Sequence, residues 1–316
     1  MKIVIPGGSG QIGQLLARGF VSGGHEVVIL SRAAAAVGRT VPWDGRTVAA
    51  WSKEIDGADV VINLAGRTVN CRYTPENLEA MMSSRVDSTR AVGEAIAAAA
   101  SPPRVWLQMS TATIYAHRLD APNDEATGII GGKEPGVPAY WAYSVKIATE
   151  WERALNEAKT PKTRRVALRS AMMMSPDREG IFDVMLGMVR RGLGGTAAGG
   201  AQFVSWMHDT DFSKAIDLLI AREDLEGAVN LAAPNPLPYA DFMRAMREAW
   251  GIRLGLPATK WMLEIGAWAM RTDTELVLKS RRVIPGRLLE AGFEFAQPTW
   301  PEAARDLTAR WRAAQA

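Results

Sequence analysis

The chain has 316 residues, 47% hydrophobic and 22% charged, a balance typical of a globular protein with one large or two fused domains. Its formal net charge of +3 is spread without a Lys/Arg block, which argues against nucleic-acid binding. Cys71 is the single cysteine, so no internal disulfide can form, and we expect a cytoplasmic protein. Because the sequence begins directly in an expected strand, we expect no signal peptide. Without metal-ligand spacing or a long apolar run, we expect neither a metal nor a membrane partner.

The first 32 residues predict a strand, a glycine-rich turn, a helix and a second strand. Lys2 to Pro6 is a short run rich in β-branched residues, typical of a buried strand. Gln11 to Val21 has apolar residues at helical spacing, and Gly23 and Gly24 would end that helix. His25 to Leu30 is a second buried strand. Together these parts predict one βαβ unit.

The glycines between the strand and the helix suit a dinucleotide-binding turn. Gly7 allows a tight turn, Gly10 lets a pyrophosphate approach the backbone, and Gly13 lets the helix pack close to the sheet. The start of the helix offers free N–H groups and the positive end of its dipole to phosphates. The alternative is a tight turn that binds no ligand. The cofactor contacts predicted in this turn are Gly7, Ser9, Gly10, Gln11, Ile12 and Gly13.

The end of the second predicted strand indicates which dinucleotide binds. A carboxylate at this position would bind the ribose 2′-OH and favour NAD, but the chain has Ser31 and Arg32 there. Ser31 can donate to a 2′-phosphate, and Arg32 can pair with it. The alternative is a solvated surface arginine. We predict NADP(H) as the cofactor.

Farther along, predicted strands and helices alternate, which indicates a parallel sheet. One helix begins after Thr74, its expected cap, and runs to about Ala100; another covers Ala139 to Lys159. Ala33 to Gly57 and His117 to Pro138 are expected to be irregular. We predict an α/β protein, an NAD(P)-binding Rossmann fold with a doubly wound parallel sheet. Further strands are predicted at Asp59 to Leu64, Arg104 to Met109, Arg164 to Met173 and Ala228 to Ala232.

The second half of the chain predicts a smaller substrate-side domain. We expect residues 1–175 to form the dinucleotide-binding domain, completed by about 203–233, and the remaining residues, 176–202 and 234–316, to form the smaller one. Amphipathic helices are predicted at Tyr239 to Trp250 and at Lys260 to Met270. The expected core and pocket wall of this part are Trp261, Trp268, Trp300 and Trp311.

Several motifs resemble the extended short-chain dehydrogenase/reductase superfamily. They are Gly7 to Gly13, Asn63 to Gly66 and Ser110 to Tyr115. Later motifs are similar to the SDR39U1-like or YfcH-like subgroup of epimerase family proteins, which has its own C-terminal domain of unknown function. These are Ser84 to Arg90, Gly192 to Gly195, Ser205 to His208, Ala233 to Pro236 and Ile284 to Phe293. The resemblance covers the chain nearly from end to end.

The resemblance implies roles for residues at the strand ends. Thr111 is at the position of the superfamily's catalytic Ser/Thr, and Ser110 would line the nicotinamide side. Arg85 replaces an Asn near the nicotinamide ribose and could reach a phosphate or a carboxylate substrate. His208 beside Asp209 suggests acid–base chemistry, but in this superfamily the position usually orders a loop, so we expect a structural role. The other cofactor contacts implied are Leu64, Ala65, Gly66 and Met173.

The expected proton-transfer pair is displaced in this chain. The superfamily places Tyr four residues before Lys, but Ala142 stands four residues before Lys146 and Tyr143 stands three before it. Residues three apart also share a helix face, so Tyr143 and Lys146 remain candidate catalytic residues beside Thr111. The alternative is that Tyr143 packs and Lys146 is solvated or contacts the cofactor ribose.

Two classes of function follow. One is an NADP(H)-dependent oxidoreductase or an epimerase/dehydratase-like enzyme acting on an unidentified small molecule. The other is a catalytically silent NADP(H)-binding protein that senses redox state or binds a partner. A nucleotide-sugar epimerase is a third interpretation, although nothing in the sequence specifies a nucleoside diphosphate site. The sequence allows for a homodimer but does not determine the oligomeric state.

Overall fold

A computed structural model describes residues 1–259 and 273–315 of the chain. Its main sheet has seven parallel strands in the order β10-β6-β5-β4-β1-β2-β3. Because β1 lies between β4 and β2, the strand order reverses at β1, and in folds of this kind the ligand crevice lies at the carboxyl ends of the strands on either side of that reversal, here β1 and β4. The strands are β1 Lys2–Pro6, β2 Glu26–Ser31, β3 Arg39–Pro42, β4 Val60–Asn63, β5 Val105–Thr111, β6 Arg164–Ser170 and β10 Gly227–Leu231.

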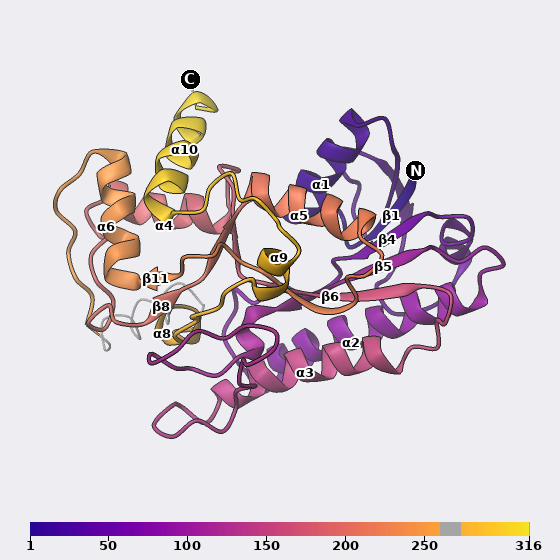
Figure 1. The fold of residues 1–316 in the computed structure, drawn as a ribbon, viewed down its shortest axis with the longest axis horizontal. Helices are drawn as coiled ribbons and strands as arrows, with labels where there is room; N and C mark the ends of the chain where they lie inside the picture. Colours follow the sequence, from indigo (N-terminus) through magenta and orange to yellow (C-terminus); the bar gives the residue numbers. More distant parts are fainter. Residues whose placement is uncertain (260–272, 316) are drawn as a thin grey trace.

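Helices cover both faces of this sheet (Figure 1). Alternate residues of β1 face opposite sides, since Ile3 and Ile5 belong to one apolar cluster and Val4 to another. All three side chains are fully buried, as expected for a doubly covered parallel sheet. The helices are α1 Gln11–Ser22 and α5 Asp209–Ala221 on one face, and α2 Pro75–Ala98 and α3 Trp141–Glu157 on the other. The predicted doubly wound fold is confirmed.

Two segments of the main domain differ from the sequence prediction. The stretch from Ala33 to Gly57 is not wholly irregular, because it contains β3 and a short 3-10 helix, η1 Ala50–Glu54. Strand β3 is four residues long and lies exposed or half-exposed at the sheet edge, so it lacks a clear apolar pattern. The strand predicted from Arg164 to Met173 ends at Ser170, and a separate strand, β7 Met172–Met174, follows it. A continuous apolar run does not reveal such a break.

A smaller assembly lies beside the sheet, at the left of Figure 1. Its aromatic core includes Trp300 stacked on Phe242 with ring centroids 3.9 Å apart, and it also contains Trp311. The predicted core role is thus confirmed for Trp300 and Trp311; Lys260 to Met270, with Trp261 and Trp268, lie outside the described residues. The domain boundaries stay a prediction. Its elements are α4 Ile181–Arg190, β8 Phe203–Val204, β9 Trp206–His208, β11 Leu237–Pro238, α6 Tyr239–Trp250, α8 Glu275–Leu278 and α10 Trp300–Ala313. Helix α9 Gly286–Glu290 packs instead on β10 of the main sheet, where Leu288 joins the main apolar cluster.

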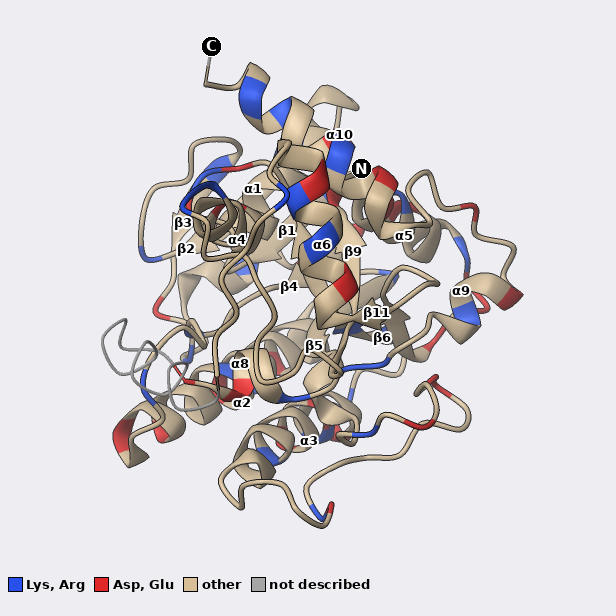
Figure 2. Cartoon of the chain, turned by 90° about the vertical axis from the view of Figure 1, so that its left-hand side faces the viewer, with Lys and Arg blue, Asp and Glu red and all other residues tan. Residues whose placement is uncertain are grey.

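Lys and Arg are interspersed with Asp and Glu along α6 and α10, as Figure 2 shows. Within residues 1–259 and 273–315, no helix is both long and apolar enough to span a bilayer. The same ranges contain no group of three or more His, Cys, Asp or Glu arranged to hold a metal ion.

Candidate functional site at the carboxyl end of the sheet

The glycine turn brings β1 and β4 into contact. Gly7 has a φ of +74°, which favours glycine, and a Cβ added there would lie 2.6 Å from the Cα of Ala65. Likewise, a Cβ on Gly13 would lie 2.4 Å from the Cα of Gly8, so helix α1 packs directly on the turn. The positive φ of Gly7 fits the tight turn predicted for it, and the contact of Gly13 with Gly8 fits the close packing predicted for the helix.

The N-terminus of α1 is open. Gly10 is its N-cap; no side chain caps the helix, and its first turn has no acidic residue. A Cβ on Gly10 would meet nothing closer than the carbonyl oxygen of Gly7, 3.9 Å away. Gln11 Nε2 donates to Ser175 Oγ at 3.0 Å, and half-buried Ile12 packs against the core. The free backbone N–H groups and the space beside Gly10 fit a pyrophosphate.

The hydroxyl groups of Ser31 and Ser9 meet beside this turn. Ser31 Oγ donates to Ser9 Oγ at 2.6 Å and accepts from Ala33 N at 3.2 Å. Ser31 is buried, whereas Arg32 is exposed and makes no side-chain hydrogen bond or ion pair within the described ranges. No Asp or Glu occurs in residues 30–42. An anion at the end of β2 would thus meet a free guanidinium and no carboxylate from this segment.

The carboxyl end of β4 is ordered by buried amides and covered by an arginine. Asn63 donates to Gln108 and accepts from Ala65 N at 3.0 Å, next to half-buried Leu64. Arg85, on α2, lies against Gly66, whose added Cβ would be 3.4 Å from the guanidinium carbon. This guanidinium donates to the carbonyl groups of Met81 and Arg67, both at 3.0 Å, and lies over the ring of Trp151. Burial lowers the pKa of Arg85 to about 10.

Strand β5 ends in two hydroxyls that point to different partners. Ser110 is buried and donates to Glu152 Oε1 at 2.6 Å, so its hydroxyl is engaged within the protein. Thr111 is half-buried, and its Oγ1 accepts from the N–H of Thr113 at 3.2 Å, which leaves the hydroxyl hydrogen available to another acceptor. Of these two hydroxyls, only that of Thr111 keeps its hydrogen available.

Glu152 belongs to a polar network that the sequence analysis missed. Arg169 donates to both carboxylate oxygens of Glu152, at 2.9 and 2.8 Å, and to the hydroxyl of Tyr115 at 2.9 Å. Tyr115 donates to Asn230, whose backbone N–H donates to Glu125 at 2.7 Å. Burial raises the pKa of Glu125. The network ties β5, β6, β10 and α3 together behind Thr111.

Tyr143 and Lys146 come together, but not at the end of β5. The Nζ of Lys146 lies 5.7 Å from the ring centroid of Tyr143. The α3 face toward β5 is marked by Ala148, which belongs to the apolar cluster of Ala112 and Ile114. Tyr143 and Lys146 instead line a hollow of about 250 Å³ between α2 and α3. The other residues of this hollow are Glu79, Met82, Ser83, Val86, Asp87 and Glu150. A catalytic role for the pair stays a prediction.

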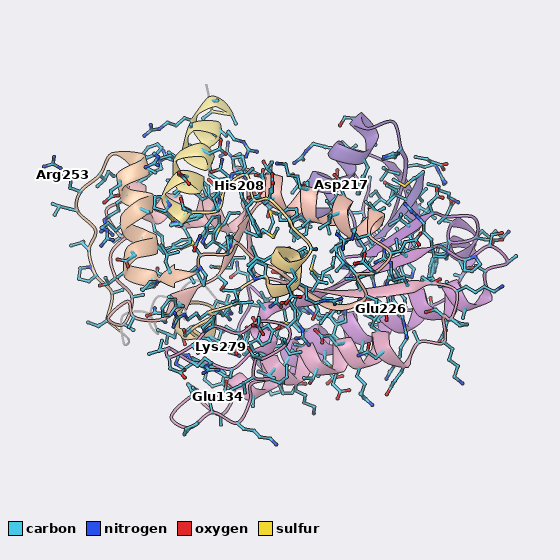
Figure 3. All side chains as sticks on the ribbon, in the orientation of Figure 1. Glu134, His208, Asp217, Glu226, Arg253 and Lys279 are labelled. Atoms are coloured by element: carbon cyan, nitrogen blue, oxygen red, sulfur yellow. The ribbon has the colours of Figure 1, made fainter. Side chains whose placement is uncertain are left out.

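A C-terminal segment, residues 273–284, contacts the short 3-10 helix η2 Ala112–Ile114, which follows β5. Lys279 Nζ donates to the carbonyl of Thr113 at 2.9 Å, and Arg281 Nε donates to Thr113 Oγ1 at 3.1 Å. Ser280 N donates to His117 Nδ1 at 2.8 Å. Figure 3 labels Lys279 near Glu134, well away from His208. This segment therefore brings two basic side chains to a position two residues beyond Thr111.

The same segment carries buried ionisable groups. The side chain of Glu275 is fully buried, accepts from Ser144 Oγ at 2.5 Å and pairs with Lys279 at 3.8 Å. Burial lowers the pKa of Lys279 to about 8 and raises that of Glu275. Burial also raises the pKa of the Tyr73 phenol. The charge of Arg281 and a hydrogen bond with Ser144 partly offset this rise. Perturbed groups gathered at a strand end mark a candidate functional site.

Two further predicted residues have places inside the protein. Met173 is buried in β7, which pairs with β9, and belongs to the main apolar cluster. His208 caps α5 by accepting from Thr210 N at 3.2 Å, and its Nε2 lies 3.0 Å from Asp306. Because Arg310 in turn binds Asp209, the expected structural role of His208 is confirmed.

The doubly wound sheet with its glycine turn defines an NAD(P)-binding Rossmann protein of the extended short-chain dehydrogenase/reductase type. The sequence profile of the NAD dependent epimerase/dehydratase family matches residues 3–232, and that of a domain of unknown function, DUF1731, matches residues 258–307. The chain therefore belongs to the NAD dependent epimerase/dehydratase family and is an SDR39U1-like member of it.

Known proteins resemble the chain over nearly its whole length. Epimerase family protein SDR39U1 of Bos taurus is 28% identical over 98% of this chain and 100% of its own. Epimerase family protein YfhF of Bacillus subtilis is 28% identical over 93% and 94%. The crystal structure of human epimerase family protein SDR39U1, isoform 2, with NADPH has a TM-score of 0.82, with 25% identity over 98% and 99% of the two chains.

Proposed function

We propose that the chain is an NADP(H)-dependent oxidoreductase or epimerase-like enzyme that acts on a small molecule. The observation that carries the proposal is the open N-terminus of α1 at the β1/β4 crevice, next to a β2 end with Arg32 and no carboxylate. The NADPH in the human SDR39U1 crystal structure supports this choice of dinucleotide. A homodimer and a cytoplasmic location stay predictions.

Each part of the crevice would hold one part of the cofactor. The α1 N-terminus and Gly10 would bind the pyrophosphate, and Ser9, Ser31 and Arg32 the 2′-phosphate. When bound, the nicotinamide would supply hydride chemistry. Thr111 has a hydroxyl hydrogen free to donate to a substrate oxygen. The residues on either side of Thr111, Ser110 and Ala112, are buried, which supports limited access of water to this hydroxyl.

A catalytically silent NADP(H)-binding protein is the second candidate. The orientation of Tyr143 and Lys146 toward α2 favours it, because the usual phenol is then missing from the end of β5. The two candidates differ in turnover. For an enzyme, Thr111→Val would abolish NADPH oxidation by a carbonyl substrate without changing NADPH affinity. A loss of turnover in Tyr143→Phe would show that the displaced Tyr143/Lys146 pair takes part in the reaction. A silent protein would show no turnover to lose.

The first experiment is a titration of the protein with NADPH and with NADH, followed by energy transfer from its 11 Trp to the reduced nicotinamide. We expect NADPH to bind about tenfold more tightly, because a charge-assisted pair adds roughly 1.5 kcal/mol. Arg32→Ala should remove this preference and leave the NADH affinity unchanged. Arg46→Ala, in an exposed turn, is the matched control. If neither dinucleotide binds, the glycine turn is purely structural and the proposal is wrong.

A further inference from the structure

Arg281 is a half-buried guanidinium with an open donor edge. Its Nε donates to Thr113 Oγ1 at 3.1 Å. Its Nη1 lies 3.4, 3.2 and 3.3 Å from the carbonyl oxygens of Glu275, Leu276 and Lys279, which are long bonds shared by one nitrogen. Within residues 1–259 and 273–315, Nη2 has no hydrogen-bond acceptor and no carboxylate forms an ion pair with Arg281. The guanidinium is therefore held in place while one edge remains unused.

Three carboxylates of this region are hydrogen-bonded to other groups, and of these Glu275 also interacts electrostatically with Arg281. Glu275 accepts from Ser144 and pairs with Lys279. Glu134 accepts from the backbone N–H groups of His117 and Gly132. Asp273 accepts from the N–H of Glu275 at 2.9 Å. None of the three supplies the two parallel acceptors that a guanidinium fork prefers.

The open edge lies where a substrate would meet the cofactor. Thr113, which holds Arg281, follows Thr111 by two residues at the carboxyl end of β5. Both Arg85 and Arg281 interact electrostatically with Tyr73, so the two guanidinium groups are near the same phenol. Arg85 already uses both terminal nitrogens on backbone carbonyls. Arg281 is thus the guanidinium here with capacity left for an anion.

We propose that Arg281 binds an anionic group of the small-molecule substrate, a carboxylate in the first instance, and so places the reacting carbon near Thr111. The planar fork of arginine matches a carboxylate by two parallel N–H···O bonds, and a phosphate offers the same acceptors. The proposal rests on the proposed function for its location, because the reacting carbon is defined by the nicotinamide. It adds a substrate class, an oxo or hydroxy compound that carries an anion.

The test measures anion binding to the NADPH-saturated protein by isothermal titration calorimetry. The probes are pyruvate, its neutral analogue acetone, and inorganic phosphate. We expect pyruvate to bind and acetone not to; tighter binding of phosphate than of pyruvate would identify a phosphate as the natural group. Arg281→Met should weaken pyruvate binding by about tenfold or more, because charge-assisted hydrogen bonds are lost. Arg281→Lys, which keeps the charge without the fork, should recover part of it.

Arg282→Met is the matched control. Arg282 is the next residue, donates to the carbonyl of Leu119 and lies over the ring of Phe203, so its removal should leave pyruvate binding unchanged. Equal pyruvate binding by the wild type and Arg281→Met, equal binding of acetone, or no binding of either anion at 50 mM would overturn the proposal. If Arg281→Met fails to fold, weaker pyruvate binding by Arg281→Lys and the absence of acetone binding still test the proposal. Absence of NADPH binding would overturn the proposed function instead, and the same titration of the free protein would then decide the anion site.

Discussion

Arg169 and Arg281 both bind residues at or just after the end of β5 and differ in how their charge is neutralised. Arg169 binds both oxygens of Glu152 and also the Tyr115 hydroxyl, and the Arg169 and Glu152 side chains are each 12% exposed. Arg281 rests on Thr113 and on carbonyl oxygens, with Nη2 open within the described residues. A paired buried charge fixes the scaffold, whereas an unpaired one retains capacity for a ligand. We therefore distinguish a structural network, Arg169 with Glu152 and Tyr115, from a candidate ligand-binding group, Arg281.

The glycine turn likewise contains one position that is filled by neighbouring atoms and one that has free space beside it. Gly13 is closed, since an added Cβ would lie 2.4 Å from the backbone of Gly8. Gly10 is open, with its nearest neighbour at 3.9 Å. Both glycines belong to one motif, yet only the open one borders the space that a phosphate would fill.

The largest change in stability is expected from breaking the Arg169–Glu152 ion pair. Glu152→Gln should destabilise the fold by about 3 kcal/mol, because Arg169 then loses its carboxylate while mostly buried. Urea denaturation measures the change. Glu150→Gln, two residues earlier and paired with exposed Arg153, is the control and should cost less than about 0.5 kcal/mol. If Glu152→Gln lowers the free energy of unfolding by less than about 1 kcal/mol, the Arg169–Glu152 pair does not have the structural role that distinguishes it from Arg281.

A second prediction concerns pH. Burial holds the pKa of Lys279 at about 8, below the ordinary 10.5. Between these values the unfolded chain binds a proton that the folded chain does not, so this group makes the unfolding free energy rise as pH increases from 8 to 10.5. The gain is on the order of 2 kcal/mol. Denaturation of the wild type and Lys279→Met across this range should show a shallower rise for the variant. Parallel curves would mean that Lys279 titrates normally.

The glycine pair gives a third prediction. Gly13→Ala should cost about 1 to 3 kcal/mol, because its Cβ meets backbone that cannot move aside. Gly10→Ala should change stability by only a few tenths of a kcal/mol but weaken NADPH binding, since the methyl group enters the phosphate space. Thermal unfolding and NADPH titration of both variants measure the two effects. Equal NADPH affinity of Gly10→Ala and the wild type would place the pyrophosphate elsewhere.

Among the arginine substitutions, the smaller change in stability is expected for Arg281→Met. Arg281 is half-buried and forms no ion pair within residues 1–259 and 273–315, so we expect its replacement by an apolar side chain of similar length to cost less than about 1 kcal/mol. Arg169→Met should cost about 3 kcal/mol in the same assay, because it leaves Glu152 uncompensated. Equal losses for the two methionine variants would show that Arg281 is a structural residue like Arg169.

Local patterns predicted the cofactor side of the site. The glycine turn, the ends of β2 and β4 and the cap of α2 all depend on residues close in sequence, such as Thr74, which accepts from Asn77 N. Edge strand β3 escaped prediction because its four residues carry no clear apolar pattern. The displacement of Tyr143 was visible as a spacing, but its direction toward α2 was not.

Long-range contacts account for what the sequence could not reveal. Lys279 and Thr113 are 166 residues apart, and Arg281 and Thr113 are 168 apart. Neither basic residue belongs to a local motif that specifies the end of β5. Glu152 could have been suspected, since it lies on a predicted helix with Lys146, but its partner Arg169 lies on the next strand. Only the fold brings these residues to the crevice.

The most direct measurement is a crystal structure of the NADPH complex. We expect the 2′-phosphate against Ser31 and Arg32, the nicotinamide within hydrogen-bond reach of the Thr111 hydroxyl, and the Nη2 edge of Arg281 open toward the space above the ring. A nicotinamide away from the end of β5, or an Arg281 paired with a carboxylate of the protein, would contradict it.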